Sequence, residues 1–258
     1  MNATPAFEKC LAFINCQLQP ARGGSGAKGG LVRQAVTISR QGGSGGHAVA
    51  SALAEYLQKR APDDGCPWAV FDRNLVGKVL EDHNLPKRLA RFMPEDRISE
   101  MADTMDELFG LHPPSWTLVR QASETILHLA ELGHVILIGR GAHIITAKLD
   151  YVFHVRLVGS LEKRVEHMQA LEHLSRKEAL ALVRREDRGR RRYLKKYFDS
   201  DIDDPLHYHL VINTDLVSYE EAARLVGDAL LDQAPADGVI RASAAANKRV
   251  LVAAAPRG

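Results

Sequence analysis

Cysteine is scarce in this 258-residue chain, which has Cys10, Cys16 and Cys66 and no other. An odd count without a CxxC pair does not match a disulfide framework, so none is expected, and a reducing compartment fits this composition. His207, His209 and the nearby acidic residues 199–204 lack partners at zinc-site spacing. The sequence therefore predicts no dedicated metal site.

Long apolar runs are also lacking, because no stretch approaches the roughly 20 residues that a membrane helix needs. The N-terminus does not show the basic-then-apolar order of a secretory signal. The net charge of +2 is too small to indicate a nucleic-acid or membrane partner for the molecule as a whole. These absences favour a cytoplasmic protein that acts on neither partner.

The composition that is present, 45% hydrophobic and 26% charged, is ordinary for a globular protein and sufficient to bury one sizeable core. Residues 1–30 combine a short amphipathic helix with a Gly-rich linker, residues 31–232 form the predicted folded domain, and residues 233–258 are Ala-rich and expected to be disordered. Docking of the tethered N-terminal helix on a second subunit would give a homodimer, although docking on its own core is the alternative.

Apolar runs alternate with amphipathic stretches inside residues 31–232. Strands are predicted at Ala35–Ser39, Trp68–Phe71, Val135–Ile138, Tyr151–Leu157 and His209–Ile212. Helices are predicted at Gly46–Arg60, Arg73–Asn84, Ser99–Phe109, Ser115–Leu132, Ser160–Gln169, Ser175–Lys196 and Ser218–Leu231. This alternation predicts an α/β fold with a five-stranded parallel sheet and helices on both faces. Ligands of such sheets bind at the carboxyl ends of the strands.

A glycine-rich segment, SRQGGSGGHA (residues 39–48), joins the first predicted strand to a helix. Four glycines within five positions allow backbone N–H groups to surround an anion, and the helix N-terminus adds partial positive charge. The predicted phosphate-binding residues are Gly42, Gly43, Ser44, Gly45, Gly46 and His47. A flexible turn is the alternative without function.

Two phosphate-loop templates compete for this segment. Aligned on Gly46, the GxxxxGK[ST] pattern meets His47 at the lysine position and Ala48 at the hydroxyl position. The dinucleotide pattern GxGxxG/A fits Gly43, Gly45 and Ala48, with Asp72 as a ribose acceptor. The loop alone does not decide between a kinase and an NAD(P)-dependent oxidoreductase.

Two further segments favour phosphoryl transfer. The strand VILI is followed by Gly139-Arg140-Gly141, which places an arginine at the carboxyl edge of the sheet. Residues 184–196 carry eight basic and two acidic side chains. Phosphoryl transfer needs cations around the moving group and a lid that excludes water, so an arginine-rich helical lid is favoured over a solvated helix face or a nucleic-acid contact.

The segments SRQGGSGGHAVASALAEYL, VFDRNLV, VILIGRGAHII, REDRGRRRYLKKYF and LVINTDLVSYEEAARLV together resemble the cytidylate-kinase-like branch of the nucleoside monophosphate kinases. The resemblance covers nearly all of residues 35–232. It implies a P-loop kinase fold, ATP and Mg²⁺ as cofactors, and phosphoryl transfer to a monophosphate, CMP first.

The resemblance also implies roles for individual residues. Asp72 and Arg73 would begin the acceptor-binding segment, and Arg140 would hold the acceptor phosphate. The catalytic candidates of the lid are Arg184, Asp187, Arg188, Arg190 and Arg191. The chain departs from the family pattern at His47, where the loop lysine is missing, and at Gly141, where the family has an acidic residue after the arginine.

Three functional hypotheses follow. The first is a nucleoside monophosphate kinase. A neutral imidazole carries no dependable charge at pH 7, so the second is a nucleotide sensor of the same fold in which transfer is lost. The third is the oxidoreductase that would use Gly43, Gly45 and Asp72.

Overall fold

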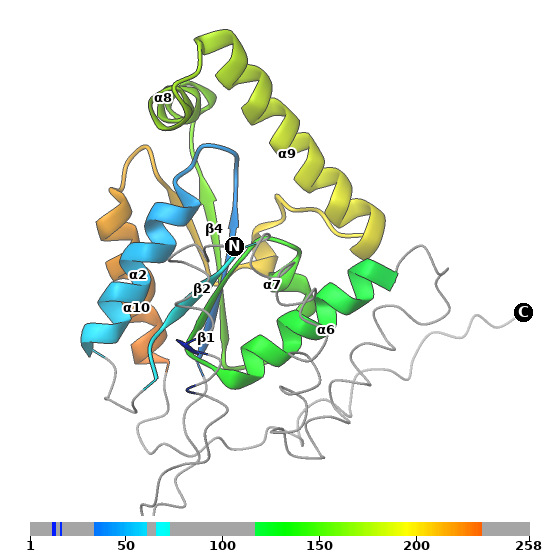
Figure 1. Ribbon diagram of the computed structural model, residues 1–258, viewed down its shortest axis with the longest axis vertical. Coiled ribbons are helices and arrows are strands. Elements are labelled where there is room, and N and C mark those ends of the chain that lie inside the picture. Colours follow the sequence, from blue (N-terminus) through cyan, green and yellow to red (C-terminus); the bar gives the residue numbers. More distant parts are fainter. Residues whose placement is uncertain (1–11, 14–15, 17–33, 61–65, 73–116, 234–258) are drawn as a thin grey trace, which may run out of the picture.

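The computed structural model describes residues 12–13, 16, 34–60, 66–72 and 117–233 (Figure 1). Its strands are β1 (Ala35–Arg40), β2 (Ala69–Phe71), β3 (Val135–Ile138), β4 (Val152–Val158) and β5 (Leu210–Asn213). Its helices are α2 (Gly46–Arg60), α6 (Thr117–Leu132), α7 (Ala142–Ile145), α8 (Leu161–Glu172), α9 (Arg176–Phe198) and α10 (Tyr219–Asp232), with a 3-10 turn at Pro205–His207. The helices expected at Arg73–Asn84 and Ser99–Phe109, the linker and the tail lie outside the described residues.

The five strands form one parallel sheet in the order β2-β3-β1-β4-β5, which confirms the predicted sheet. The chain leaves β1 for the β2 edge, returns through β3 to one side of β1, and then places β4 on its other side. This reversal at β1 creates the crevice in which open α/β sheets bind ligands. The glycine-rich segment after β1 therefore lies at the topological switch point.

The same strand order contradicts the oxidoreductase hypothesis. In the dinucleotide fold, the second strand pairs directly with the first, so that an acidic residue at its end reaches the ribose of a nucleotide bound over the first loop. Here β3 separates β2 from β1. The GxGxxA match of the loop is therefore not accompanied by the strand arrangement that a dinucleotide needs.

Helices cover both faces of the sheet, as predicted from the sequence (Figure 1). Period-2 alternation along the strands separates two cores: Val36 and Ile38 of β1 pack with α2 and α10, whereas Ala35 packs on the α6 side. Phe13, fully buried, joins the α6-side core against the edge of Phe71, with ring centroids 6.0 Å apart. The described residues of the N-terminal segment therefore dock on the chain's own core.

Cys16 and Cys66 form a disulfide across 50 residues of sequence, with their Cα atoms 5.8 Å apart. The expectation that the cysteines form no disulfide is wrong. The spacing of the cysteines could not reveal the pairing, because it depends on the N-terminal segment packing beside the start of β2. The pairing also removes the support that the cysteine count lent to a reducing compartment.

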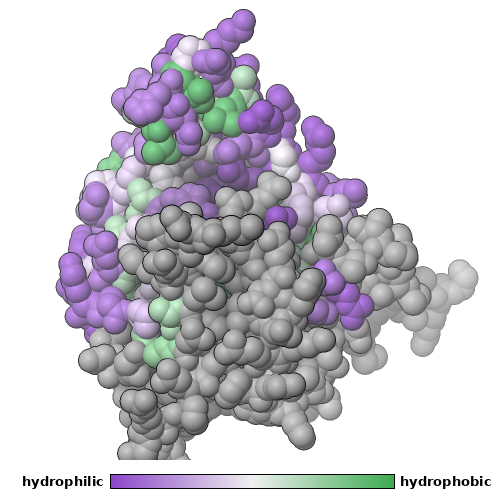
Figure 2. Space-filling view, in the orientation of Figure 1, coloured by the Kyte–Doolittle hydropathy of each residue, from purple (hydrophilic) through white to green (hydrophobic). Residues whose placement is uncertain are grey.

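Helices α8 and α9 form a hairpin that projects beyond the carboxyl edge of the sheet (Figure 1). A capping box between Ser175 and Glu178 starts α9, which then continues without a break through the whole basic segment. Val165, Met168, Ala179 and Val183 give the hairpin a small core of its own. Its exposed surface is largely hydrophilic (Figure 2). No helix in the described part of the chain is long and apolar enough to cross a membrane.

Candidate active site

The loop after β1 needs glycine at two of its positions. Gly43 and Gly45 have φ angles of 81° and 75°, in the left-handed region where side chains are strained. A Cβ at Gly43 would lie 2.4 Å from the carbonyl oxygen of Arg164, and one at Gly45 would lie 2.2 Å from the ring of Tyr219. The loop therefore packs closely against Arg164 and Tyr219. It leads directly into the N-terminus of α2, and a helix N-terminus favours the binding of an anion.

Arg164 of α8 connects the loop to the lid. Its Nη1 donates to the carbonyl oxygen of Gly42 at 2.9 Å and to Asp187 Oδ2 at 2.7 Å, and its Nε donates to the Gly159 carbonyl at 2.9 Å. The N–H of Gly42 donates to the other carboxylate oxygen of Asp187 at 2.6 Å. Arg164 and Asp187 are both largely buried, at 8% and 15% side-chain exposure. The triad of Gly42, Arg164 and Asp187, here called the lid latch, holds α9 against the loop.

The segment after β3 has an unusual backbone. Gly139, Arg140 and Gly141 all have positive φ, at 78°, 57° and 73°. Left-handed backbone at a residue other than glycine is strained and gathers at functional sites. The Nε of Arg140 is buried and has no hydrogen-bond partner among the described residues. A bound anion would satisfy it.

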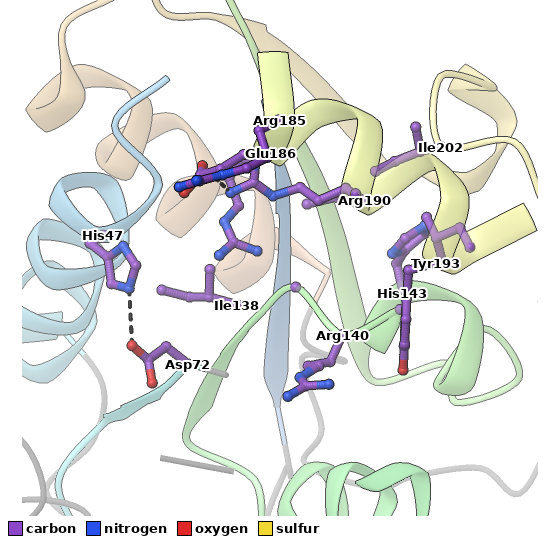
Figure 3. A pocket seen from close by; sticks show the side chains of 16 residues that line it. His47, Asp72, Ile138, Arg140, His143, Arg185, Glu186, Arg190, Tyr193 and Ile202 are labelled. Carbon is purple, nitrogen blue, oxygen red and sulfur yellow. Dashed lines mark hydrogen bonds and ion pairs between the residues drawn. The ribbon is translucent and has the colours of Figure 1, made fainter. Parts of the chain in front are cut away.

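A cavity of about 560 Å³ lies between the ends of the loop, the segment after β3 and α9. It is lined by Ser39, Arg40, His47, Asp72, Ile138, Gly139, Arg140, Gly141, His143, Arg185, Glu186, Gly189, Arg190, Tyr193, Leu194 and Ile202. Of the predicted phosphate-binding residues, His47 lines it, whereas Gly42, Gly43, Ser44, Gly45 and Gly46 do not. Figure 3 shows Arg185, Glu186 and Arg190 on the α9 side, Arg140 across from them, and His143 beside Tyr193. The cavity is large enough for a nucleotide-sized ligand.

The predicted lid residues occupy different places around this cavity. Arg190 lines it and pairs with Glu186 at 2.7 Å. Arg184 and Arg188 are exposed on α9 and do not line it, while Arg191 pairs with Asp203 at 3.0 Å. Asp187 belongs to the lid latch. Arg73 lies outside the described residues, so its predicted role stays a prediction.

His47 and Asp72 face each other at one side of the cavity, from α2 and from the end of β2 (Figure 3). His47 Nε2 lies 3.2 Å from Asp72 Oδ2, and the imidazole is 64% exposed. The imidazole at the lysine position is therefore directed to a carboxylate, away from the centre of the glycine-rich loop. Its predicted part in donor binding remains a prediction.

Sequence reasoning missed Arg164 and Arg185, and it missed a polar network behind the cavity. Tyr208 Oη donates to the carbonyl of Ile202 at 2.8 Å and lies 3.2 Å from His143 Nε2. Burial, followed by the positive charges of nearby groups, lowers the pKa of His143 to about 3. No sequence signal distinguishes Arg164 from other helical arginines, because its contacts come from three separate segments. Arg185, in contrast, was visible within the predicted basic run.

Residues that could hold a metal are few. The described part of the chain contains no cluster of three or more His, Cys, Asp or Glu side chains with metal-binding geometry. Asp72 and Glu186 are the carboxylates that line the cavity. Each of them already pairs with a basic side chain, Asp72 with His47 and Glu186 with Arg190. Mg²⁺ binds through one or two carboxylates together with substrate phosphates and water, so the expected Mg²⁺ stays a prediction.

A parallel sheet with a glycine-rich phosphate loop at its switch point and an arginine-rich helical hairpin above it defines an α/β protein with the P-loop kinase fold. The chain belongs to the cytidylate kinase-like family, whose model matches residues 35–216. The predicted fold class and family are thereby confirmed. Membership supports phosphoryl transfer of the nucleotide-kinase type as the class of reaction.

Solved structures agree with the fold. An uncharacterized protein from Eubacterium ventriosum ATCC 27560 matches with a TM-score of 0.61 and 20% identity, over 78% of this chain and 99% of that chain. Shikimate kinase from Bacteroides thetaiotaomicron matches at TM-score 0.39 and 13% identity, over 77% and 96% of the two chains. A gluconokinase from Sinorhizobium meliloti 1021 matches at 0.36 and 13%, over 80% and 99%. The first of the three bears on the fold, since the other scores are low. No curated protein matches the chain significantly.

Proposed function

We propose that this protein transfers a phosphoryl group from ATP to a nucleoside monophosphate, with CMP as the first candidate acceptor. One observation carries the proposal: a cavity of about 560 Å³ is lined by Arg40 and His47 at the two ends of the glycine-rich loop, by Arg140, and by Arg185 and Arg190 of the basic helix α9. Donor phosphates bind the loop amides and the α2 N-terminus, and acceptor phosphate binds Arg140. The two phosphates then meet over the carboxyl ends of β1 and β3.

The chemistry follows from charge and position. Phosphoryl transfer needs little covalent assistance, because the barrier falls when cations surround the transferring group and water is excluded. Arg185 and Arg190 reach the cavity from α9, and Arg140 reaches it from the β3 end. Asp72 and Glu186 would hold the Mg²⁺ of the nucleotide, which supplies further positive charge when bound. No side-chain base is assigned.

A second candidate function is nucleotide sensing without turnover. It is favoured by His47, which occupies the lysine position of the loop and pairs with Asp72. Loss of a phosphate-neutralising cation costs orders of magnitude in rate, while the amides of the loop still bind nucleotide. In this case His47→Lys would create or raise turnover in a protein that binds ATP tightly.

A coupled assay of ADP release from Mg-ATP tests both candidates. The acceptor panel is CMP, dCMP, UMP, AMP, GMP and a few phosphorylatable metabolites. Acceptor-dependent turnover with one monophosphate supports the kinase and names its substrate. Binding of ATP without turnover on any acceptor supports the sensor. Turnover on a sugar or other metabolite alone would overturn the choice of a nucleoside monophosphate.

A further inference from the structure

Arg40 is the last residue of β1, and it lines the cavity directly before the glycine-rich loop. A Cβ at Gly46, the first residue of α2, would lie 3.0 Å from Arg40 Cγ. A Cβ at Gly139 would lie 2.1 Å from Arg40 Nη1. The side chain therefore passes the N-terminus of α2 and brings its guanidinium against the backbone after β3.

No carboxylate among the described residues forms an ion pair with Arg40, although Glu186 and Asp72 are close enough for their charges to raise its pKa. By comparison, Arg190 pairs with Glu186 and Asp187, and Arg156 pairs with Asp203. A largely buried cation without a direct ion pair is unfavourable. Burial first, and the charge of Arg190 second, lower the pKa of Arg40 to about 10, so it remains protonated at neutral pH.

The loop does not supply this charge itself. Its lysine position holds His47, which is exposed and directed to Asp72. A lysine at that position of a phosphate loop reaches the outer phosphates of the nucleotide. Arg40 approaches the same end of the loop from the strand before it, beside Gly46.

We propose that Arg40 is the cation that binds the outer phosphates of the donor, in place of a lysine in the loop. The assignment rests on the proposed function for the identity of the donor. The guanidinium fills the space beside Gly139, where a Cβ would have to displace it, and the φ of 78° favours glycine there independently. A planar guanidinium can also donate two parallel hydrogen bonds to phosphate, which a loop lysine cannot.

The test compares the wild-type chain with Arg40→Met and Arg40→Lys, and with Arg60→Met as a matched control far from the cavity. Calorimetry measures binding of a non-hydrolysable ATP analogue and of inorganic tripolyphosphate, and the coupled assay measures turnover. We expect Arg40→Met to weaken both ligands by at least about tenfold, Arg40→Lys to recover part of the loss, and Arg60→Met to behave as wild type. In the Arg40→Met background, His47→Lys should restore binding.

A second variant leaves the charge in place. Gly139→Ala should displace the guanidinium and weaken tripolyphosphate binding while Arg40 is still present. Thermal melting of every variant shows whether it is folded. Unchanged binding in folded Arg40→Met, with normal turnover, would overturn the role of Arg40 and leave the kinase intact. If Arg40→Met loses tripolyphosphate binding but the wild-type chain phosphorylates no acceptor, the role of Arg40 in phosphate binding is supported and the kinase function is rejected. A wild-type chain that binds neither ligand would overturn both.

Discussion

Arg140 combines a strained backbone with a buried nitrogen that lacks a partner among the described residues. Neither feature favours the folded chain by itself, since a left-handed conformation costs on the order of 1 kcal/mol at a residue with a side chain. Glycine would adopt the same φ of 57° without this strain. The arginine side chain is therefore explained better by ligand binding than by stability.

The substitution Arg140→Gly distinguishes a role of Arg140 in ligand binding from a role in stability. We expect kcat/KM with the best acceptor to fall by about 100- to 1,000-fold, as for other lost transition-state charges. The free energy of unfolding should stay within about 1 kcal/mol of wild type, because relief of strain offsets the added freedom of the unfolded chain. Urea titration and the coupled assay give the two numbers. Equal losses of stability and turnover would contradict the assignment.

For Gly43 we expect the opposite result, which is that a substitution lowers the stability of the fold. Its φ is positive, and an alanine Cβ at this position would lie 2.4 Å from the Arg164 carbonyl oxygen, so Gly43→Ala must move backbone. We expect the free energy of unfolding to fall by at least about 2 kcal/mol. At Gly42 the same substitution meets the ends of the Glu186, Arg190 and Asp187 side chains at 3.1–3.3 Å, which can adjust. Gly42→Ala is thus the matched control, and a larger loss there than at Gly43 would refute the loop geometry.

At the scale of helices and strands, local pattern was sufficient for most boundaries. β3 and α2 begin and end at the predicted residues, and β1 extends one residue beyond its predicted end. Alternating burial and helix capping are encoded over a few residues, which is why they can be recognised. The lid latch and the disulfide could not be predicted, because each joins residues whose closeness depends on the completed packing.

The lid latch connects α9 to the glycine-rich loop through a largely buried ion pair and the hydrogen bonds of Gly42. Removing one member of a buried ion pair leaves the other unpaired and costs about 3–5 kcal/mol. A double-mutant cycle with Arg164→Met and Asp187→Leu should give a coupling energy of about 1–3 kcal/mol. The exposed pair of Arg176 and Glu162, in the same hairpin, is the control and should couple by less than about 1 kcal/mol. Similar coupling in both pairs would mean that the latch does not hold the lid.

Considered as a whole, the molecule places its binding cavity directly beside a buried polar layer. His143 lines the cavity and is 3% exposed, while His154, 6% exposed, lies 2.8 Å from Thr37 Oγ1. Burial, followed by neighbouring positive charge, lowers the pKa of His143 to about 3 and that of His154 to about 4. Both imidazoles are therefore neutral in the native state at pH 7. Protonation of either would place a charge in the wall between the sheet and the ligand.

The stability of the whole fold should consequently depend on pH. In the unfolded chain a histidine has a pKa of about 6.5, so between about pH 6.5 and about pH 4 the unfolded state binds protons that the native state does not. The free energy of unfolding must fall as pH falls, by up to about 1.4 kcal/mol per pH unit for each histidine. Urea titrations at about pH 7, 6 and 5 measure the slope. The double variant His143→Gln/His154→Gln should flatten it, whereas His173→Asn, at an exposed position, should not. An unchanged slope in the double variant would show that other groups govern the acid stability, and that the polar layer beside the cavity tolerates charge.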